Sequence, residues 1–226
     1  MAIAKYFIEK VIINNYTGSL LRKRGIFMFK KFLAIMGCLM IFSMLNTSAV
    51  WAKNKVFEQT LYWQNYSFDI EAKNQNLTIK SHGLTDDKKE VHDITGYSVN
   101  NIEVADLNND GYPELLIYLT NDGKSQYGQL LAYTTDRGTN LSLIAVEAIE
   151  DNLTLAENYR GHDVMMVEDN KLVRIYPIYL LSDQNDKPTG GVRKVTYKLV
   201  DTNNGSIFRI EKYADFNLDS VVVLDK

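Results

Sequence analysis

The sequence predicts an all-β fold: an antiparallel two-sheet β-sandwich with a single short helix near residues 153–160. Short apolar or alternating segments recur along residues 53–226, and alternation with a period of two is typical of half-buried strands. Asn, Asp and Gly residues separate these segments, and such residues favour tight turns. Many short strands separated by turns favour a sandwich of antiparallel sheets.

The first half of this region contains a predicted hairpin, a further strand, and a long apolar strand. Gln64-Asn65 is the predicted turn of the hairpin, and the apolar run at 115–119 is the predicted central strand of a sheet, because it shows no alternation. The expected strands lie at 61–63, 66–70, 77–79, 102–105, 115–119 and 129–134.

The second half contains two further predicted hairpins. Asp169-Asn170 is the expected turn of one, and Asn204-Gly205 is the strongest turn signal in the chain, since both residue types tolerate positive φ. A long polar loop at 182–191 separates the two hairpins. The expected strands lie at 164–167, 172–179, 192–200 and 207–210.

Residues 28–52 have the layout of a signal peptide. Lys30 and Lys31 precede an apolar run at 32–45, which is shorter than a membrane-spanning helix, and a region of small and polar residues ends at Ala52. We expect cleavage after Ala52, export, and no membrane segment in the mature protein. The alternatives are a retained anchor and a lipoprotein lipidated at Cys38.

The predicted signal peptide divides the chain into an upstream segment and a mature domain. Met28 would be its natural start, so residues 1–27 are an upstream extension or a misassigned start. Residues 53–226 then form a single β domain, which is long enough to bury a core.

Charge and cysteine content exclude several function classes. Cys38 is the only cysteine, so residues 53–226 hold no disulfide, no cysteine nucleophile and no cysteine-ligated zinc. These residues hold 18 of the 25 Lys and Arg residues and 27 of the 28 Asp and Glu residues, a net charge of −9. Nucleic acid would be repelled by this charge, whereas a basic protein partner would be attracted.

An Asx-rich turn follows the strand at 102–105. Its pattern D-x-N-x-D-G-x-x-E comprises Asp106, Asn108, Asp110, Gly111 and Glu114. Hard oxygen atoms at alternate positions suit Ca²⁺, and the motif resembles the calcium loops of FG-GAP-type β-propeller repeats. The alternative is a purely structural turn, in which Asx side chains bond to the backbone. The sequence therefore leaves two alternatives for these residues, calcium binding and a purely structural turn.

The loop after the central strand carries hydroxyl groups at its tip. It contains Lys124, Ser125, Tyr127 and Gly128. The segments VADLNNDGYPELLIYL and GKSQYGQLLAY around it resemble the periplasmic inhibitors of invertebrate-type lysozyme. Further segments resemble the same family in the same order: YRGHD (159–163), LVRIYPIY (172–179), PTGG (188–191) and YKLV (197–200). The resemblance covers residues 56–213.

This resemblance implies a small β-sandwich protein of the bacterial envelope that blocks lysozyme with a loop. Members of such families carry a Ser-Gly-x-Tyr loop that enters the enzyme's cleft. This chain departs from that pattern, because it has Lys124-Ser125-Gln126-Tyr127. Either Ser125 supplies the hydroxyl one position later, or Lys124 supplies a charge instead. The structural alternative for Tyr127 is an ordinary aromatic of a hairpin, packed on a sheet face.

The resemblance also implies a possible second contact loop and a protein that is not an enzyme. Tyr159, Arg160 and His162 form either a second contact with the enzyme or a hydrogen-bonded turn. The chain has three histidines, none with zinc spacing, and no serine in a nucleophile elbow. We therefore expect a non-enzymatic periplasmic protein that needs no cofactor and binds an invertebrate-type lysozyme. The alternative is a calcium-stabilised FG-GAP-like binding or adhesion module without inhibitory activity.

Overall fold

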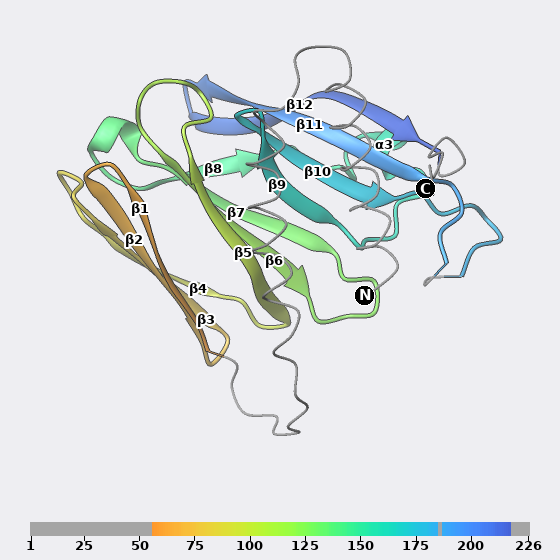
Figure 1. Cartoon of the computed structure of the whole chain (residues 1–226), viewed down its shortest axis with the longest axis horizontal. Coiled ribbons are helices and arrows are strands. Elements are labelled where there is room, and N and C mark those ends of the chain that lie inside the picture. The colour runs from red at the N-terminus through yellow and green to blue at the C-terminus, as the bar shows by residue number, and fades with distance from the viewer. Residues whose placement is uncertain (1–55, 185–186, 218–226) are drawn as a thin grey trace, which may run out of the picture.

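The computed structural model describes residues 56–184 and 187–217, and it confirms the all-β fold with two sheets (Figure 1). The predicted signal peptide at 28–52 and the segment at 1–27 lie outside the described residues. Within the described ranges, no helix is long and apolar enough to span a membrane.

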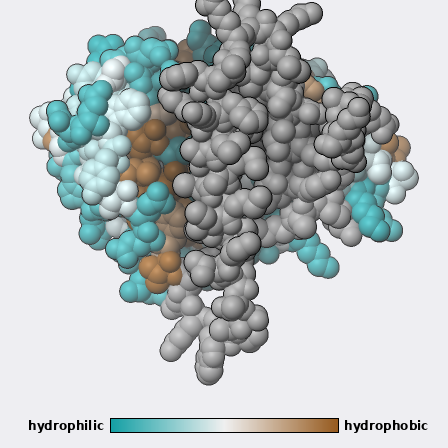
Figure 2. Space-filling model, viewed as in Figure 1, coloured by the Kyte–Doolittle hydropathy of each residue, from teal (hydrophilic) through white to brown (hydrophobic). Residues whose placement is uncertain are grey.

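The smaller sheet is a four-stranded antiparallel meander at the left of Figure 1. Gln64, with φ 49°, forms the predicted turn of its first hairpin. Figure 2 shows mainly hydrophilic groups over this part of the surface. The strands are β1 (Phe57–Trp63), β2 (Tyr66–Lys73), β3 (Asn76–His82) and β4 (Lys89–Asp93).

The larger sheet has eight strands in the order β5-β6-β7-β8-β12-β11-β10-β9. All neighbours are antiparallel except β8 and β12, which pair in parallel at Ala145–Ile207 and Val146–Phe208. The predicted antiparallel, two-sheet fold is confirmed, and this one parallel pair is a local departure from it. The strands are β5 (Tyr97–Ala105), β6 (Glu114–Asn121), β7 (Gly128–Thr134), β8 (Ser142–Val146), β9 (Val164–Glu168), β10 (Lys171–Pro177), β11 (Val192–Thr202) and β12 (Gly205–Phe216).

The eight-stranded sheet curls until its two end strands, β5 and β9, lie beside each other. Glu103 of β5 bridges the remaining gap, because one carboxylate oxygen accepts hydrogen bonds from the Val167 N–H at 2.9 Å and the Tyr118 hydroxyl at 2.5 Å. The sheet therefore nearly closes into a barrel without a continuous ladder between its ends.

Two apolar cores result from this arrangement, and β6 contributes to both. Leu115 and Ile117 belong to the core that includes Phe68 and Ile79 of the smaller sheet. Leu116 and Tyr118 face the interior of the curled sheet. Burial on both faces explains why the run at 115–119 is continuously apolar, and it confirms the prediction of a central strand.

Local differences from the sequence-based expectations have clear causes. The helix α3 covers only Leu153–Ala156, capped by the Asn152 side chain, because Glu157 is extended and Tyr159 forms a β-bridge with Ile178. A short 3₁₀ turn, η1, covers Asp136–Gly138. In the last hairpin Asn203 and Asn204 form the turn, one residue earlier than expected, and Gly205 takes the left-handed conformation at φ 110°.

Candidate functional site

The loop of residues 124–128, here called the 124–128 loop, joins β6 to β7 and is fixed at its base by Asn121. The Asn121 N–H donates to the Tyr127 carbonyl at 3.0 Å, and the Tyr127 N–H donates to the Asn121 side-chain oxygen at 2.9 Å. Within the loop, the Gln126 N–H donates to Gly123 at 3.1 Å. These bonds give the loop a defined shape without a partner.

A second loop, residues 159–162, packs directly against the first, although 35 residues separate their anchors, Gly128 and Asp163, in the sequence. The His162 N–H donates to the carbonyl groups of Ser125 at 2.8 Å and Gln126 at 3.2 Å. Gly161 makes this approach possible, since an added Cβ would lie 2.1 Å from the Ser125 carbonyl oxygen. The two sets of residues that the sequence singled out separately thus form one surface.

Asp163 ties the two loops to the interior of the curled sheet. Its carboxylate accepts hydrogen bonds from the Gly128 N–H at 2.7 Å and the Tyr159 hydroxyl at 2.7 Å. The Arg174 Nε donates to the same carboxylate at 2.8 Å, in an ion pair whose side chains are 9% and 0% exposed. Burial alone would lower the pKa of Arg174, but the Asp163 charge raises it above its ordinary value.

The outer side of this surface presents polar hydrogen atoms. Lys124 and Tyr127 are exposed and Ser125 is half-buried. Within the described parts of the chain, the Lys124 ammonium and the hydroxyl groups of Ser125 and Tyr127 make no hydrogen bond or ion pair. The Tyr127 ring lies edge-on to Tyr159, with centroids 5.6 Å apart.

The remaining residues of the second loop are partly engaged within the fold. The Arg160 guanidinium lies 5.2 Å from the centre of the Tyr179 ring and donates to the Asp183 carbonyl at 3.0 Å. The His162 and Tyr179 rings lie 6.2 Å apart. Because Arg160 and His162 are both half-buried, the 159–162 loop supports the 124–128 loop and presents only part of its own surface.

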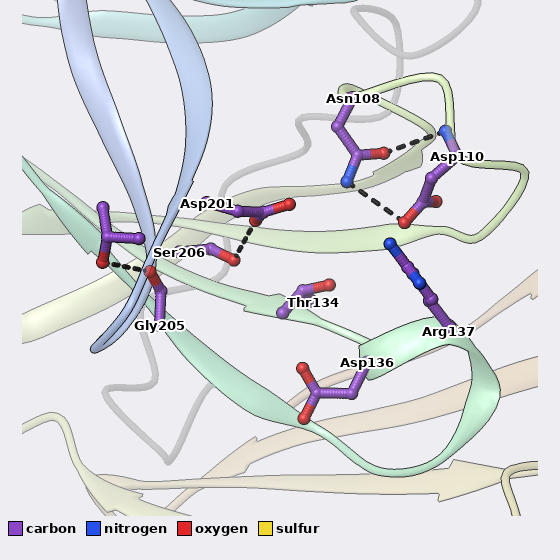
Figure 3. A pocket seen from close by; sticks show the side chains of 9 residues that line it. Asn108, Asp110, Thr134, Asp136, Arg137, Asp201, Gly205 and Ser206 are labelled. Carbon is purple, nitrogen blue, oxygen red and sulfur yellow. Dashed lines mark hydrogen bonds between the residues drawn. The ribbon is translucent and has the colours of Figure 1, made fainter.

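The Asx-rich turn lies at the other end of β6, at the upper left of Figure 1, and belongs to a different surface. The Asp106 carboxylate accepts hydrogen bonds from the N–H groups of Asp110 at 3.1 Å and Gly111 at 2.9 Å. The Asn108 side chain bonds to Asp110, as Figure 3 shows. The turn is therefore held by its own side chains, as the structural interpretation predicts.

Glu114 is the exceptional residue of this turn, because it is fully buried. Its carboxylate accepts hydrogen bonds from the Leu107 N–H at 2.7 Å and the Thr134 hydroxyl at 3.4 Å. Burial raises its pKa to about 7, and the charges of Asp110 and Asp106 add to the rise. In the described residues, no three His, Cys, Asp or Glu side chains are arranged to hold a metal ion.

Two functional residues, Asp163 and Arg174, were not identified as such from the sequence. Arg174 stands between Leu172 and Tyr176 on the inward face of β10. A single arginine on an otherwise apolar strand face was the available signal, since a buried charge requires a partner. The sequence gives no indication that the partner is Asp163.

We expect Gly161→Ala to destabilise the protein more than Gly111→Ala. Both glycines have a left-handed φ, 85° and 88°, but a Cβ at Gly111 meets nothing within 4 Å. The additional effect at Gly161 therefore comes from the collision with Ser125, at about 1–3 kcal/mol. Urea denaturation of both variants measures the difference, and equal losses of stability would show that the two loops do not touch.

Comparison with known proteins yields no relative: no protein-family model, no curated protein and no solved structure matches this chain.

Proposed function

We propose that this protein inhibits invertebrate-type lysozyme by inserting the 124–128 loop into the enzyme's active-site cleft. The observation that supports the proposal is the joint surface of the 124–128 and 159–162 loops, which presents Tyr127 on a hydrogen-bonded base. Both loops are singled out by the resemblance to lysozyme inhibitors. The role proposed for the protein is protection of bacterial peptidoglycan in the periplasm.

The chemistry of the target explains why these side chains would inhibit it. A retaining glycosidase uses two carboxyl groups about 5 Å apart, one of them protonated. The hydroxyl groups of Tyr127 and Ser125 and the Lys124 ammonium can donate to the ionised carboxylate. Such charge-assisted hydrogen bonds are strong where water is excluded. The loop would occupy the sugar subsite without offering a glycosidic bond.

The preformed shape of the loop favours tight binding. Asn121, Gly123 and His162 fix its backbone through hydrogen bonds, so little conformational entropy is lost on association. Tyrosine is also a favoured anchor in protein interfaces. The net charge of −9 over residues 53–226 would accelerate the approach of a basic enzyme.

Titration of muramidase activity tests the proposal. The purified protein is added in increasing amounts to invertebrate-, chicken- and goose-type lysozymes. We expect stoichiometric loss of the invertebrate-type activity and none of the other two. Full activity of the invertebrate-type enzyme at a large molar excess of the protein would contradict the proposal.

The second candidate is the calcium-stabilised FG-GAP-like binding module, and the observation in its favour is Glu114. A buried carboxyl group whose pKa is raised to about 7 beside Asp106 and Asp110 carries an unfavourable charge that a divalent cation would offset. Against it, the oxygen atoms of Asp106, Asn108 and Asp110 already accept backbone hydrogen bonds. This candidate predicts calcium-dependent stability and no inhibition of lysozyme.

A further inference from the structure

A cavity of about 410 Å³ opens beside Tyr127 at one mouth of the curled sheet. Its walls come from β5, β7, β8, β9, β10 and β11, from the segment that follows β8, and from the 124–128 and 159–162 loops. Barrel mouths are a common location for small-molecule sites, and this volume lies within their usual range. The proposed role of the 124–128 loop does not account for this cavity.

Four tyrosine rings contribute to the wall: Tyr97, Tyr127, Tyr159 and Tyr197. Leu130 and Met165 add apolar surface between them. The face of an aromatic ring carries partial negative charge, so a wall of several rings favours a cation over an anion.

The charged groups of the cavity also favour a cation. Glu147, Glu150 and Arg174 line it, but Arg174 is already neutralised by the Asp163 carboxylate at 2.8 Å. Burial is the main cause that raises the pKa values of Tyr159 and Tyr197; the Arg174 charge opposes the rise in both, and the charges of Asp163 and Glu150 add to it. The charge of Glu150 therefore reaches the tyrosine wall, and the opposing charge of Arg174 is balanced by its ion pair with Asp163.

Tyr197 provides an independent indication of a ligand. The residue is only 1% exposed and lines the cavity. Its hydroxyl is buried and, within the described structure, makes no hydrogen bond of good geometry, although the Arg174 guanidinium lies near enough to act on it electrostatically. Nearly all buried hydroxyl groups in proteins are hydrogen-bonded, because an unpaired one costs free energy. A polar group of a bound molecule would supply the missing partner.

We infer that this cavity binds a small organic cation, in which an ammonium group is attached to an apolar body. The apolar body would pack against Leu130 and Met165, and the cation would lie among the tyrosine rings near Glu150. An anion would meet two carboxylates and a guanidinium that is already paired. A neutral apolar molecule would remove water from Glu147 and Glu150 without compensation.

An NMR titration with three probes of similar size tests this inference. The probes are 2-phenylethylammonium, whose N–H groups can donate to the Tyr197 hydroxyl, its uncharged carbon analogue propylbenzene, and phenylacetate. We expect saturable binding of the cation, with shifts at Tyr197 and Leu130, and at least tenfold weaker binding of the other two. Equal affinity for the uncharged analogue or for phenylacetate, or no saturable binding of the cation, would overturn the inference.

A matched pair of variants tests the role of Glu150. Glu150→Gln removes an exposed carboxylate that lines the cavity, and Glu157→Gln removes an exposed carboxylate nearby in the sequence that does not. We expect the first to weaken binding of 2-phenylethylammonium about tenfold and the second to leave it unchanged. Equal effects of the two variants would show that general surface charge holds the probe. Because no lysozyme is present, these results are independent of the proposed inhibition.

Discussion

Asp163→Asn is expected to cost about 3–5 kcal/mol of stability, because it leaves the buried Arg174 guanidinium without its counter-charge. The Asp163 carboxylate accepts hydrogen bonds from Arg174, Gly128 and Tyr159. An asparagine offers one acceptor oxygen and turns an amide group toward the remaining donors. The same substitution therefore also loosens the connection between the 124–128 and 159–162 loops.

Urea denaturation at pH 7 measures this effect, and the chain offers a matched control. Lys171 and Glu211 form an ion pair with a similarly short separation of 2.5 Å, but their side chains are 39% and 32% exposed. Surface pairs contribute little to stability, so Glu211→Gln is expected to have a far smaller effect. Similar losses in the two variants would contradict the anchoring role of Asp163.

Glu114→Gln is expected to stabilise the protein at pH 8 and to leave its stability at pH 4 nearly unchanged. The folded-state pKa of Glu114 is raised from its ordinary value of 4.5 to about 7. The unfolded chain therefore releases this proton first, and stability falls as the pH rises from about 4.5 to about 7. At about 1.4 kcal/mol per pKa unit, the total loss is about 3 kcal/mol.

Glutamine suits this position because it can keep both existing contacts. Its carbonyl oxygen can accept the Leu107 N–H, and its amide can donate to the Thr134 hydroxyl, the two groups that now bond to Glu114. Thermal unfolding of wild type and variant between pH 4 and pH 8 measures the gain. A wild type whose unfolding does not change over that range, together with a variant that gains nothing at pH 8, would show that Glu114 titrates normally.

The same series separates the two candidate functions at the Asx-rich turn. If the turn is purely structural, calcium and a chelator leave the Tm of the wild type unchanged at pH 8. A calcium-dependent increase in the Tm that Glu114→Gln abolishes would favour the calcium-stabilised module.

The sequence predicted those parts of the fold that depend on neighbouring residues. The hairpin turns at Gln64 and Asp169-Asn170 and the central position of 115–119 are local signals, and the structure confirms them. The parallel pairing of β8 with β12 could not be predicted, because SLIAV is short, partly exposed and pairs with a strand about 60 residues later. Curling of the larger sheet brings β5 and β9 together, where Glu103 bonds to Val167, and this is a tertiary contact that no local pattern indicates.

In the candidate site, too, the individual residues of the two loops could be predicted from the sequence, but the contacts between the loops could not. Lys124, Ser125 and Tyr127 were found from the sequence, as were Tyr159, Arg160 and His162, but only as two separate sets. The two sets come together through Gly161, which allows the loops to approach, and Asp163, which bonds to Gly128 at the start of β7 and to Arg174 of β10. These contacts join distant parts of the chain, so the sequence does not reveal them. The tyrosine-lined cavity likewise combines residues from six strands.

The measurement that tests the central proposal most directly is the inhibition constant of Tyr127→Ala against invertebrate-type lysozyme. Tyr62→Ala is the control, since Tyr62 is an exposed tyrosine of β1, in the other sheet, with 77% of its surface accessible. We expect Tyr127→Ala to weaken inhibition about 30-fold or more, as for an interface anchor, and Tyr62→Ala to inhibit like the wild type. Loss of the edge-on contact with Tyr159 is expected to lower the Tm of Tyr127→Ala by only a few degrees. Wild-type inhibition by Tyr127→Ala would contradict insertion of the 124–128 loop into the cleft.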